Sequence, residues 1–305
     1  MDLPAEILHL PYDPGPYRMA MGLQACPPDA LIELDSACPA QLGERARLLK
    51  GRPADVVACM PSGEAACGEL ASHLLGLLPA RFPDCYQPAG GGVRNHLTGE
   101  TLDPAAMAPL DLIGRLVAED FCLIRPGAAG PILVAAVLCF PARWVLAEKL
   151  GKPLLEVHAR VPAYAEKLGA PVDRFMTRLK AGRVAMRLNW SVIDDPALFQ
   201  LAGKFRDGAD ASITAENALE KLFLRVERQT FLLLHGSATV AFGIRTHVYP
   251  LARVVAVPGE AGRLAGAVRA LPVEMARYKS LGRFRGALLE ALDRECGLRR
   301  EEKSA

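Results

Sequence analysis

The sequence predicts an α+β protein, and three observations carry that prediction. Apolar side chains recur at helical spacing within residues 40–80. Residues 184–192 and 238–250 alternate apolar and polar side chains, as half-buried strands do. The short apolar runs 121–124 and 132–140 are separated by a turn sequence that contains proline and glycine, so they predict two further strands.

The first hundred residues predict an arm, helical stretches and a loop. Residues 1–20 carry four prolines and two tyrosines, which predicts an extended arm on the surface of the body. Apolar residues then mark the helical stretches at Leu42, Ala46, Leu49, Leu70, Leu74, Leu77 and Leu78. Three glycines at 90–92 open a loop that lacks the G-x-G-x-x-G spacing of a dinucleotide site.

Three further helices are predicted between residues 110 and 200. They lie at 110–118, 144–150 and 171–180, the second ended by a glycine and a proline. The pair Asp194-Asp195 precedes a proline, which is more typical of an N-cap that opens a helical turn than of a metal site.

The segment 222–251 is the most informative in the chain. It predicts a strand at 222–230, a tight helical turn at 231–236 and a strand at 238–250, although 219–230 also fits a helix. In the last strand Ala241, Gly243, Arg245, His247 and Tyr249 share one face by the period-two rule. The small residues of that face leave space beside the arginine and the histidine, as a ligand site would. Residues 260–297 predict a C-terminal helical cap.

Composition excludes several classes of function. The 305 residues carry a net charge of +2 and no basic block, so nothing points to nucleic acid. The N-terminus lacks the pattern of a signal peptide, and the most apolar run, Ile132 to Phe140, is too short to span a bilayer. We therefore expect a cytoplasmic protein with no membrane contact. The eight cysteines lack a Cys-x-x-Cys spacing and are expected to be free, buried thiols.

Four ionisable residues stand out in the segment 222–251, because its other residues are mostly apolar. Glu227, Arg228, Arg245 and His247 would be costly to bury without partners, so together they predict the wall of a functional pocket. Glu227 could accept a proton or steer a cationic substrate, and Arg245 could pair with Glu227 or hold a carboxylate. Arg187 could serve the same anion or lie on an exposed strand edge.

The histidines leave alternatives open. From the residues alone, His158 is more often a hydrogen-bonded core histidine than a metal ligand, and His247 is equally a pocket acid/base or a hydrogen-bonded strand residue. The chain has no G-x-S-x-G, H-E-x-x-H or P-loop motif, so it lacks the usual esterase, metalloprotease and nucleotide signatures.

Eight short strings occur in a recognisable order along the chain. They are LPYDPGPYRM at 10–19, EDFCLIRP at 119–126, CFPARW at 139–144, LGKP at 150–153, VHARVPAY at 157–164, RLNW at 187–190, RVERQT at 225–230 and IRTH at 244–247. Together they resemble the haem-dependent oxidative N-demethylase family nearly from end to end.

The resemblance implies a PAS-like antiparallel sheet with flanking helices and an N-terminal helical extension, built around haem b. We expect an arm and helical region at 1–110, a haem-binding core at 111–255 and a helical cap at 256–305. It also implies that electrons from NADPH arrive through flavin and a [2Fe–2S] cluster on a partner subunit. With O2, a methyl group of a small secondary amine such as dimethylamine is oxidised, and formaldehyde is released.

The resemblance also assigns roles to residues. His158 is the expected axial ligand of the haem iron, which reverses the preference drawn from the residues alone, and no cysteine lies in a P450-type loop. Arg245, Arg187 and Arg143 are expected to pair with haem propionates. Glu227 is expected to hold the substrate ammonium or manage protons.

At His247 the family usually has tyrosine, and the turn before the last strand usually reads Leu-Pro-x-Ser/Thr-Gly rather than the Leu-His-Gly-Ser found here. A histidine at 247 could alter the oxygen chemistry, change the substrate or provide a second iron ligand.

Two other classes of function remain as alternatives. One is a non-catalytic PAS-like protein that binds haem or a small ligand as a sensor or carrier. The other is a non-haem iron enzyme that uses His158, His247 and Glu227, a composition of two histidines and one carboxylate.

Overall fold

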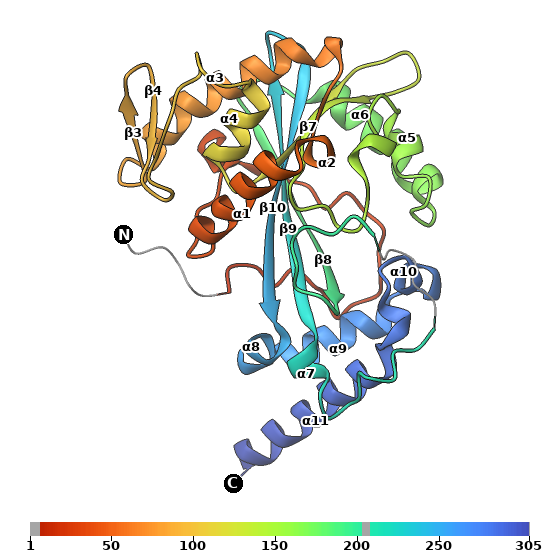
Figure 1. The fold of residues 1–305 in the computed structure, drawn as a ribbon. Helices are drawn as coiled ribbons and strands as arrows, with labels where there is room; N and C mark the ends of the chain where they lie inside the picture. The colour runs from red at the N-terminus through yellow and green to blue at the C-terminus, as the bar shows by residue number, and fades with distance from the viewer. Residues whose placement is uncertain (1–6, 203–207, 305) are drawn as a thin grey trace.

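Seven antiparallel strands form the central sheet in the computed structural model, which describes residues 7–202 and 208–304 (Figure 1). Their order across the sheet is β1-β8-β9-β10-β6-β7-β2. Their bounds are β1 Gln24–Cys26, β2 Val57–Cys59, β6 Asp120–Arg125, β7 Ile132–Val137, β8 Val184–Ile193, β9 Phe223–Leu234 and β10 Thr239–Pro250. This sheet and the helices around it confirm the α+β class.

Strands β9 and β10 form a hairpin of twelve residue pairs in the middle of the sheet. The predicted helical turn at 231–236 is wrong, because β9 continues to Leu234 and the turn begins at His235. Both faces of the sheet are covered there, so Leu232 and Leu234 enter one apolar cluster while Phe231 enters another. A strand covered on both faces loses the alternation that would reveal it.

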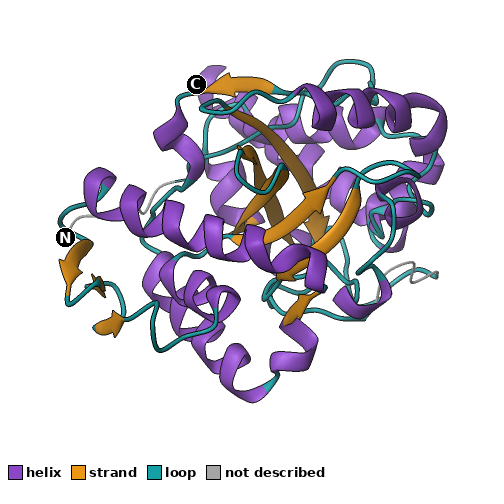
Figure 2. Cartoon of the chain, turned by 90° about the horizontal axis from the view of Figure 1, so that it is seen from above, coloured by secondary structure: helices purple, strands orange, loops and turns teal. Residues whose placement is uncertain are grey.

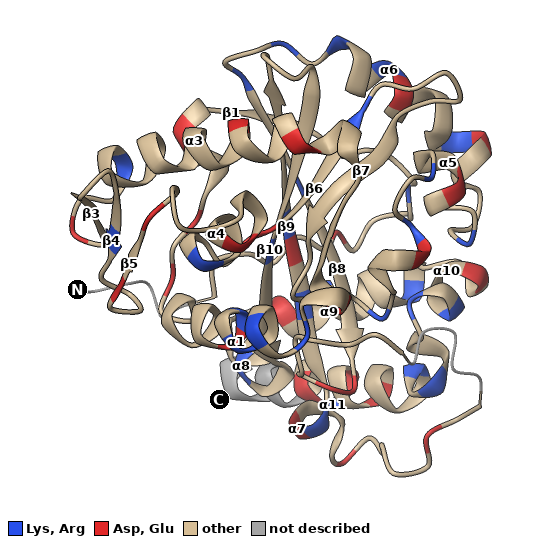
Figure 3. Cartoon of the chain, turned by 45° about the horizontal axis from the view of Figure 1, so that its top comes forward, with Lys and Arg blue, Asp and Glu red and all other residues tan. Residues whose placement is uncertain are grey.

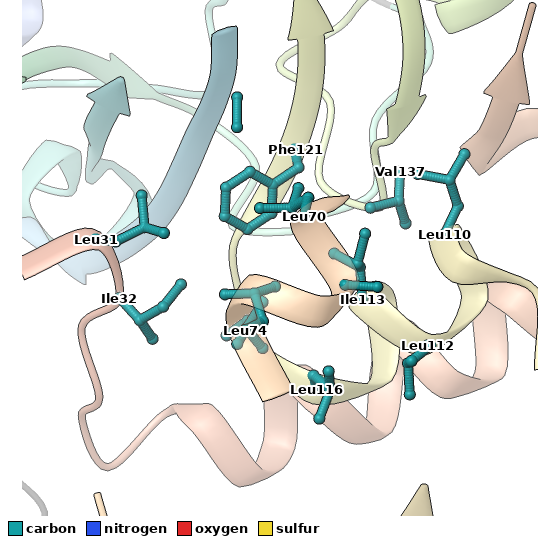
Figure 4. Close-up of a cluster of buried hydrophobic side chains, with 14 of the residues drawn as sticks. Leu31, Ile32, Leu70, Leu74, Leu110, Leu112, Ile113, Leu116, Phe121 and Val137 are labelled. Atoms are coloured by element: carbon teal, nitrogen blue, oxygen red, sulfur yellow. The ribbon is translucent and has the colours of Figure 1, made fainter. Parts of the chain in front are cut away.

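Helices α1, α3 and α4 cover one face of the sheet, which we call the α1 face (Figures 1 and 4). Their bounds are α1 Cys38–Gly51, α3 Glu64–Arg81 and α4 Pro109–Leu116, with the short α2 at Pro53–Val56. They confirm the helices expected within 40–80 and at 110–118. Leu70, Leu74 and Leu116 are fully buried against Phe121 of β6. Burial of each such side chain contributes about 1.5–3 kcal/mol.

The opposite face, the α6 face, is covered by α5 Leu154–Val157, the π-helical turn Ala165–Gly169 and α6 Ala170–Arg178 (Figure 1). Helix α6 confirms the helix predicted at 171–180. The helix predicted at 144–150 is only a 3-10 turn, Leu146–Glu148. It ends at Glu148. Gly151, with φ of +77°, lies in the turn that follows, and Pro153 then bridges back to Ile132 of β7.

The remaining helices pack at one end of the sheet (Figure 1). Seen from above, helices surround the strands (Figure 2). They are α7 Ala218–Lys221, α8 Leu251–Ala256, α9 Glu260–Ala270, α10 Val273–Tyr278 and α11 Arg285–Ser304. The cap predicted at 260–297 is thus mainly helical, but divided into three helices. The N-cap predicted at Asp194 is wrong, because no helix begins within residues 195–202. Asp194 instead pairs with Arg143 and with Arg283.

The N-terminal segment is extended, as predicted, although residues 1–6 of the expected arm lie outside the described residues. Tyr12 packs edge-to-face on Trp190 of β8, with ring centroids 5.8 Å apart. Met19 and Met21 pack on the apolar cluster of the α6 face. The arm therefore passes from one face of the sheet to the other around strand β8, before β1 pairs with that strand.

A small second sheet is formed by β3 Tyr86–Ala89, β4 Gly92–Asn95 and β5 Glu100–Leu102. All eight cysteines are free, and five of them are buried. None of the described helices is both long and apolar enough to cross a membrane.

Candidate functional site

The polar residues of β9 and β10 divide between the two faces of the sheet. Thr246 pairs with Glu227, while its neighbour His247 pairs with Val226. Residues paired across antiparallel strands share a face, and neighbours along a strand do not. Glu227 therefore lies on the α6 face, whereas Arg245 and His247 lie on the α1 face. These residues therefore do not form the single pocket wall that was predicted, because they lie on opposite faces of the sheet. Figure 3 shows charged positions on these central strands.

The structure also contradicts two other expectations, the non-haem iron site and the open space beside Ala241 and Gly243. An iron site built from His158, His247 and Glu227 would need ligands from both sides of the sheet. The space expected beside Ala241 and Gly243 is filled, because a Cβ at Gly243 would lie 2.6 Å from Thr230 Oγ1 and 3.0 Å from the Phe121 ring.

Glu227 is the acceptor of three hydrogen bonds on the α6 face. Asn189 Nδ2 donates at 3.3 Å, Gln229 Nε2 at 3.1 Å and Arg225 Nε at 3.3 Å. Burial raises the pKa of the Glu227 carboxyl, but the charge of Arg225 and the three hydrogen bonds outweigh it, so the pKa is below its ordinary value. Glu227 is thus a carboxylate at neutral pH.

The side chains around Glu227 are covered to different degrees. Arg187, Asn189, Gln229 and Ile244 are half-buried, although they lie in the interior strands of the sheet. Arg225 and Thr246, on the same face, are buried. The partly exposed side chains are therefore the ones through which a ligand would reach Glu227.

Arg187 lies on β8 opposite Gln229 of β9, on the α6 face. Its Nε atom is buried and has no hydrogen-bond partner among the described residues. Desolvation lowers the pKa of Arg187, and the negative charge of Glu227 offsets this only in part. A half-buried guanidinium with a buried, unsatisfied donor atom is suited to an anionic ligand such as a carboxylate.

His158 follows α5 on the same side of the sheet. Its Nδ1 lies 2.8 Å from the Leu154 carbonyl oxygen, and because a carbonyl only accepts, Nδ1 carries the proton. In the neutral ring Nε2 then holds the lone pair, which is the arrangement of a metal-ligating histidine. The ring stacks on Tyr164 with centroids 4.4 Å apart.

His158 lines a pocket of about 370 Å³. Leu155, Val161 and Tyr164 are among its lining residues. Tyr164 is shared with the apolar cluster of the α6 face, which includes Phe231 of β9. The pocket is therefore joined by packed side chains to the face that carries Arg187 and Glu227.

Arg143, another predicted site residue, has partners of its own. Its backbone is left-handed, with φ of +60°. Its guanidinium donates to Gln200 Oε1 at 2.8 Å and pairs with Asp194. Asp194 also accepts from Arg283 at 2.8 Å, so the charge of Arg143 is already compensated.

Arg245 and His247 are held in a buried network on the α1 face. Arg245 is fully buried and bonds to Asp35 and Gln41. His247 places Nδ1 3.0 Å from Asp35 Oδ2 and Nε2 3.0 Å from Glu33 Oε1. Burial lowers the pKa of His247, but the nearby carboxylates of Asp35 and Glu33 outweigh it and raise the pKa above its ordinary value.

Sequence reasoning missed the partners that organise both faces. Glu33 and Asp35 lie about 200 residues from Arg245 and His247 along the chain. Their one available signal is the alternation of Leu31-Ile-Glu-Leu-Asp35, in which two acids interrupt apolar residues. Asn189 and Arg225 are found only once the strand register is known.

One comparison with known proteins matches most of the chain. A family model described as haem-dependent oxidative N-demethylase, alpha subunit-like, covers residues 22–289. The matched region contains His158, Arg187 and Glu227, and it begins after His9.

Proposed function

Because the chain belongs to the haem-dependent oxidative N-demethylase alpha subunit-like family, we propose that it is a haem-dependent monooxygenase subunit. Its proposed reaction is oxidative N-demethylation of a small methylated amine. One oxygen atom of O2 goes to formaldehyde and the other to water, with two electrons and two protons consumed. Dimethylamine is the first substrate to test.

The orientation of His158 is the observation that carries this proposal. Haem iron accepts an imidazole nitrogen as an axial ligand, and the bond from Nδ1 to the Leu154 carbonyl directs the lone pair of Nε2 to that role. The donor set therefore fits the group that the family requires. We assign His158 as the axial ligand, and Tyr164 stacks on its ring and limits its rotation. Bound haem would supply the redox chemistry, in which oxygen is reduced.

Arg187 is the propionate partner that the geometry supports best. Its unsatisfied Nε needs an acceptor, and it lies on the same face as the pocket of His158. Arg143 and Arg245, which were expected to share this role, already pair with Asp194 and Asp35. We therefore assign structural roles to those two arginines and leave His247 outside the haem site.

Glu227 is proposed to hold the substrate ammonium. Its carboxylate is ionised, and Asn189, Gln229 and Arg225 fix its direction. A protonated amine is attracted to such a group, and the half-buried surroundings strengthen the attraction relative to water. After the methyl group is lost, the same carboxylate is placed to hold the ammonium of the product.

The remaining expectations are kept as parts of the proposal. The five strands β8-β9-β10-β6-β7, with α5 and α6 on one face, support a PAS-like haem-binding core at 111–255. The other proposed parts are the N-terminal region at 1–110 and the cap at 256–305. An alpha subunit-like family supports a partner subunit. We propose that it carries flavin and a [2Fe–2S] cluster and delivers electrons from NADPH to haem b.

Formaldehyde release tests the reaction. Haem-loaded protein would be given O2, NADPH, a surrogate ferredoxin and its reductase, with dimethylamine and a panel of other N-methyl amines. We expect formaldehyde in equal amount to the demethylated amine. Haem-loaded protein that releases none across the panel would contradict the proposed reaction and favour a haem sensor or carrier.

A further inference from the structure

A second group of ligand-type side chains lies on the α1 face, away from His158 and Glu227. We propose that His9, Glu33 and His247 bind one divalent transition-metal ion of the zinc type, which ties the N-terminal arm to the sheet. The three residues come from the arm, from the loop before α1 and from β10. The site does not depend on haem or on the demethylation reaction.

The ligand atoms already converge. His9 Nε2 lies 2.9 Å from Glu33 Oε1 and 3.0 Å from Oε2, and His247 Nε2 lies 3.0 Å from Oε1. One ligand atom from each residue lies within 4.8 Å of the others. Tetrahedral zinc, with bonds of about 2.0–2.1 Å, spaces its ligand atoms roughly 3.3 Å apart. The contacts of His9 and His247 to Glu33 Oε1, at 2.9 and 3.0 Å, are therefore within a few tenths of an ångström of that spacing.

Asp35 provides the support that metal-bound histidines usually have. Its Oδ2 lies 3.0 Å from His247 Nδ1, which turns Nε2 toward Glu33 and His9. Asp35 is itself fixed by the Ala37 backbone N–H at 3.0 Å and by Arg245. This carboxylate–histidine pair orients the ring and increases the basicity of the metal-binding nitrogen.

The site is closed on one side and open on the other. The His247 side chain is 2% exposed, whereas His9 and Glu33 are 16% and 21% exposed. An ion can thus enter from the His9 side, and a water molecule can complete a fourth coordination position there. Three protein ligands of the His₂Glu type with one open position match a known zinc arrangement.

Charges around the site are balanced before an ion binds. Arg228 Nε lies 3.4 Å from Glu33 Oε2, and Arg245 pairs with Asp35. The arginines hold both carboxylates in place, but they also oppose a cation. Binding must therefore come from direct coordination by the two imidazoles and Glu33 rather than from a negative field.

The arm is the part of the protein that the ion would stabilise. Its docking is already guided by the Leu8 backbone N–H, which donates to the Tyr249 hydroxyl at 3.3 Å. Arg18 is exposed and lies between His9 and Glu33 in the chain. An ion bound by both His9 and His247 would hold the arm against the body and slow tryptic cleavage at Arg18.

Zinc titration of the full-length, haem-loaded protein tests the proposal. After dialysis against chelator, we expect one equivalent of Zn²⁺ to bind by calorimetry and by elemental analysis. His9→Gln and His247→Gln should each weaken binding at least 100-fold, and Asp35→Asn should weaken it about 10–100-fold. The matched control is His96→Gln, which removes an exposed imidazole elsewhere and should leave binding unchanged.

The outcomes separate this site from the haem proposal. His158→Ala should still bind zinc, whatever happens to its haem. If His247→Gln fails to fold by circular dichroism, His9→Gln decides, because His9 lies on the surface arm. Zinc that binds no better to the parent than to His9→Gln overturns the site, as does tryptic cleavage at Arg18 that zinc leaves unchanged.

Discussion

The Nδ1 atom of His158 donates a hydrogen bond to the carbonyl oxygen of Leu154, 2.8 Å away and four residues earlier in the chain. The bond spans the single turn of α5 and sets both the tautomer and the direction of the ring. This geometry supports the proposed role of His158 as the axial ligand.

Arg187→Gln is expected to weaken haem retention about tenfold, which corresponds to about 1.4 kcal/mol. The change removes a guanidinium on the α6 face whose buried Nε has no hydrogen-bond partner among the described residues. The rate of haem transfer to an apoprotein acceptor measures the effect. Arg125→Gln is the matched control, since Arg125 is an exposed arginine at the end of β6. Equal rates for parent and Arg187→Gln would remove Arg187 from the haem site.

Glu227→Gln is expected to raise the KM for the methylated amine about 100-fold, or about 2.7 kcal/mol in binding, with the Soret band unchanged. The variant keeps the shape of the side chain but loses the charge that attracts the ammonium. Initial rates of formaldehyde release give KM and kcat separately. Glu220→Gln, at an exposed position, should behave as the parent, and a Glu227→Gln variant with an unaltered KM would exclude the proposed role.

The lowered pKa of Glu227 predicts a pH dependence of stability. The folded pKa lies below the unfolded value of about 4.3. The carboxylate therefore adds stability above the unfolded pKa, and that contribution is lost as the pH falls through the folded pKa. Urea unfolding of the parent and of Glu227→Gln should differ at pH 7, and the difference should shrink as the pH falls through the folded pKa. A difference that grows as the pH falls would contradict the assignment.

Arg245→Met is expected to destabilise the protein by about 3–5 kcal/mol without changing the haem spectrum. It removes the guanidinium from the buried Asp35 carboxylate, which keeps His247 and the Ala37 backbone N–H, and breaking a buried ion pair is costly. Denaturant unfolding measures the loss. Arg269→Gln breaks an ion pair that is about half exposed on both sides and should cost at most about 1 kcal/mol. A shifted Soret band in Arg245→Met would return Arg245 to the haem site.

Local pattern was enough to predict several of the individual elements. Alternation located β8 and β10, and helical spacing located α1, α3 and α4, because polar side chains recur among their apolar ones at the period of the element. The helical turn predicted at 231–236 failed for the opposite reason, since both faces of β9 are covered there. The helix expected at 144–150 failed because the chain returns to β7 through Pro153.

The site required information that no local pattern holds. Whether Glu227 shares a face with His247 depends on the register of β9 against β10, and a shift of one residue would reverse the answer. The carboxylates that surround His247 come from residues 33 and 35, far away along the chain. His158 was assigned through the family resemblance, because its bond to Leu154 is visible only in the folded structure.

The absorption spectrum of the purified protein tests the central claim most directly. Parent protein and the exposed-histidine control His96→Ala, both expressed with added haem precursor, should show a Soret band with about one haem per chain. His158→Ala should fold by circular dichroism but lose that band or shift it. Colourless parent protein, or a folded His158→Ala variant with the spectrum and haem content of the parent, would contradict the assignment of His158 as the axial ligand.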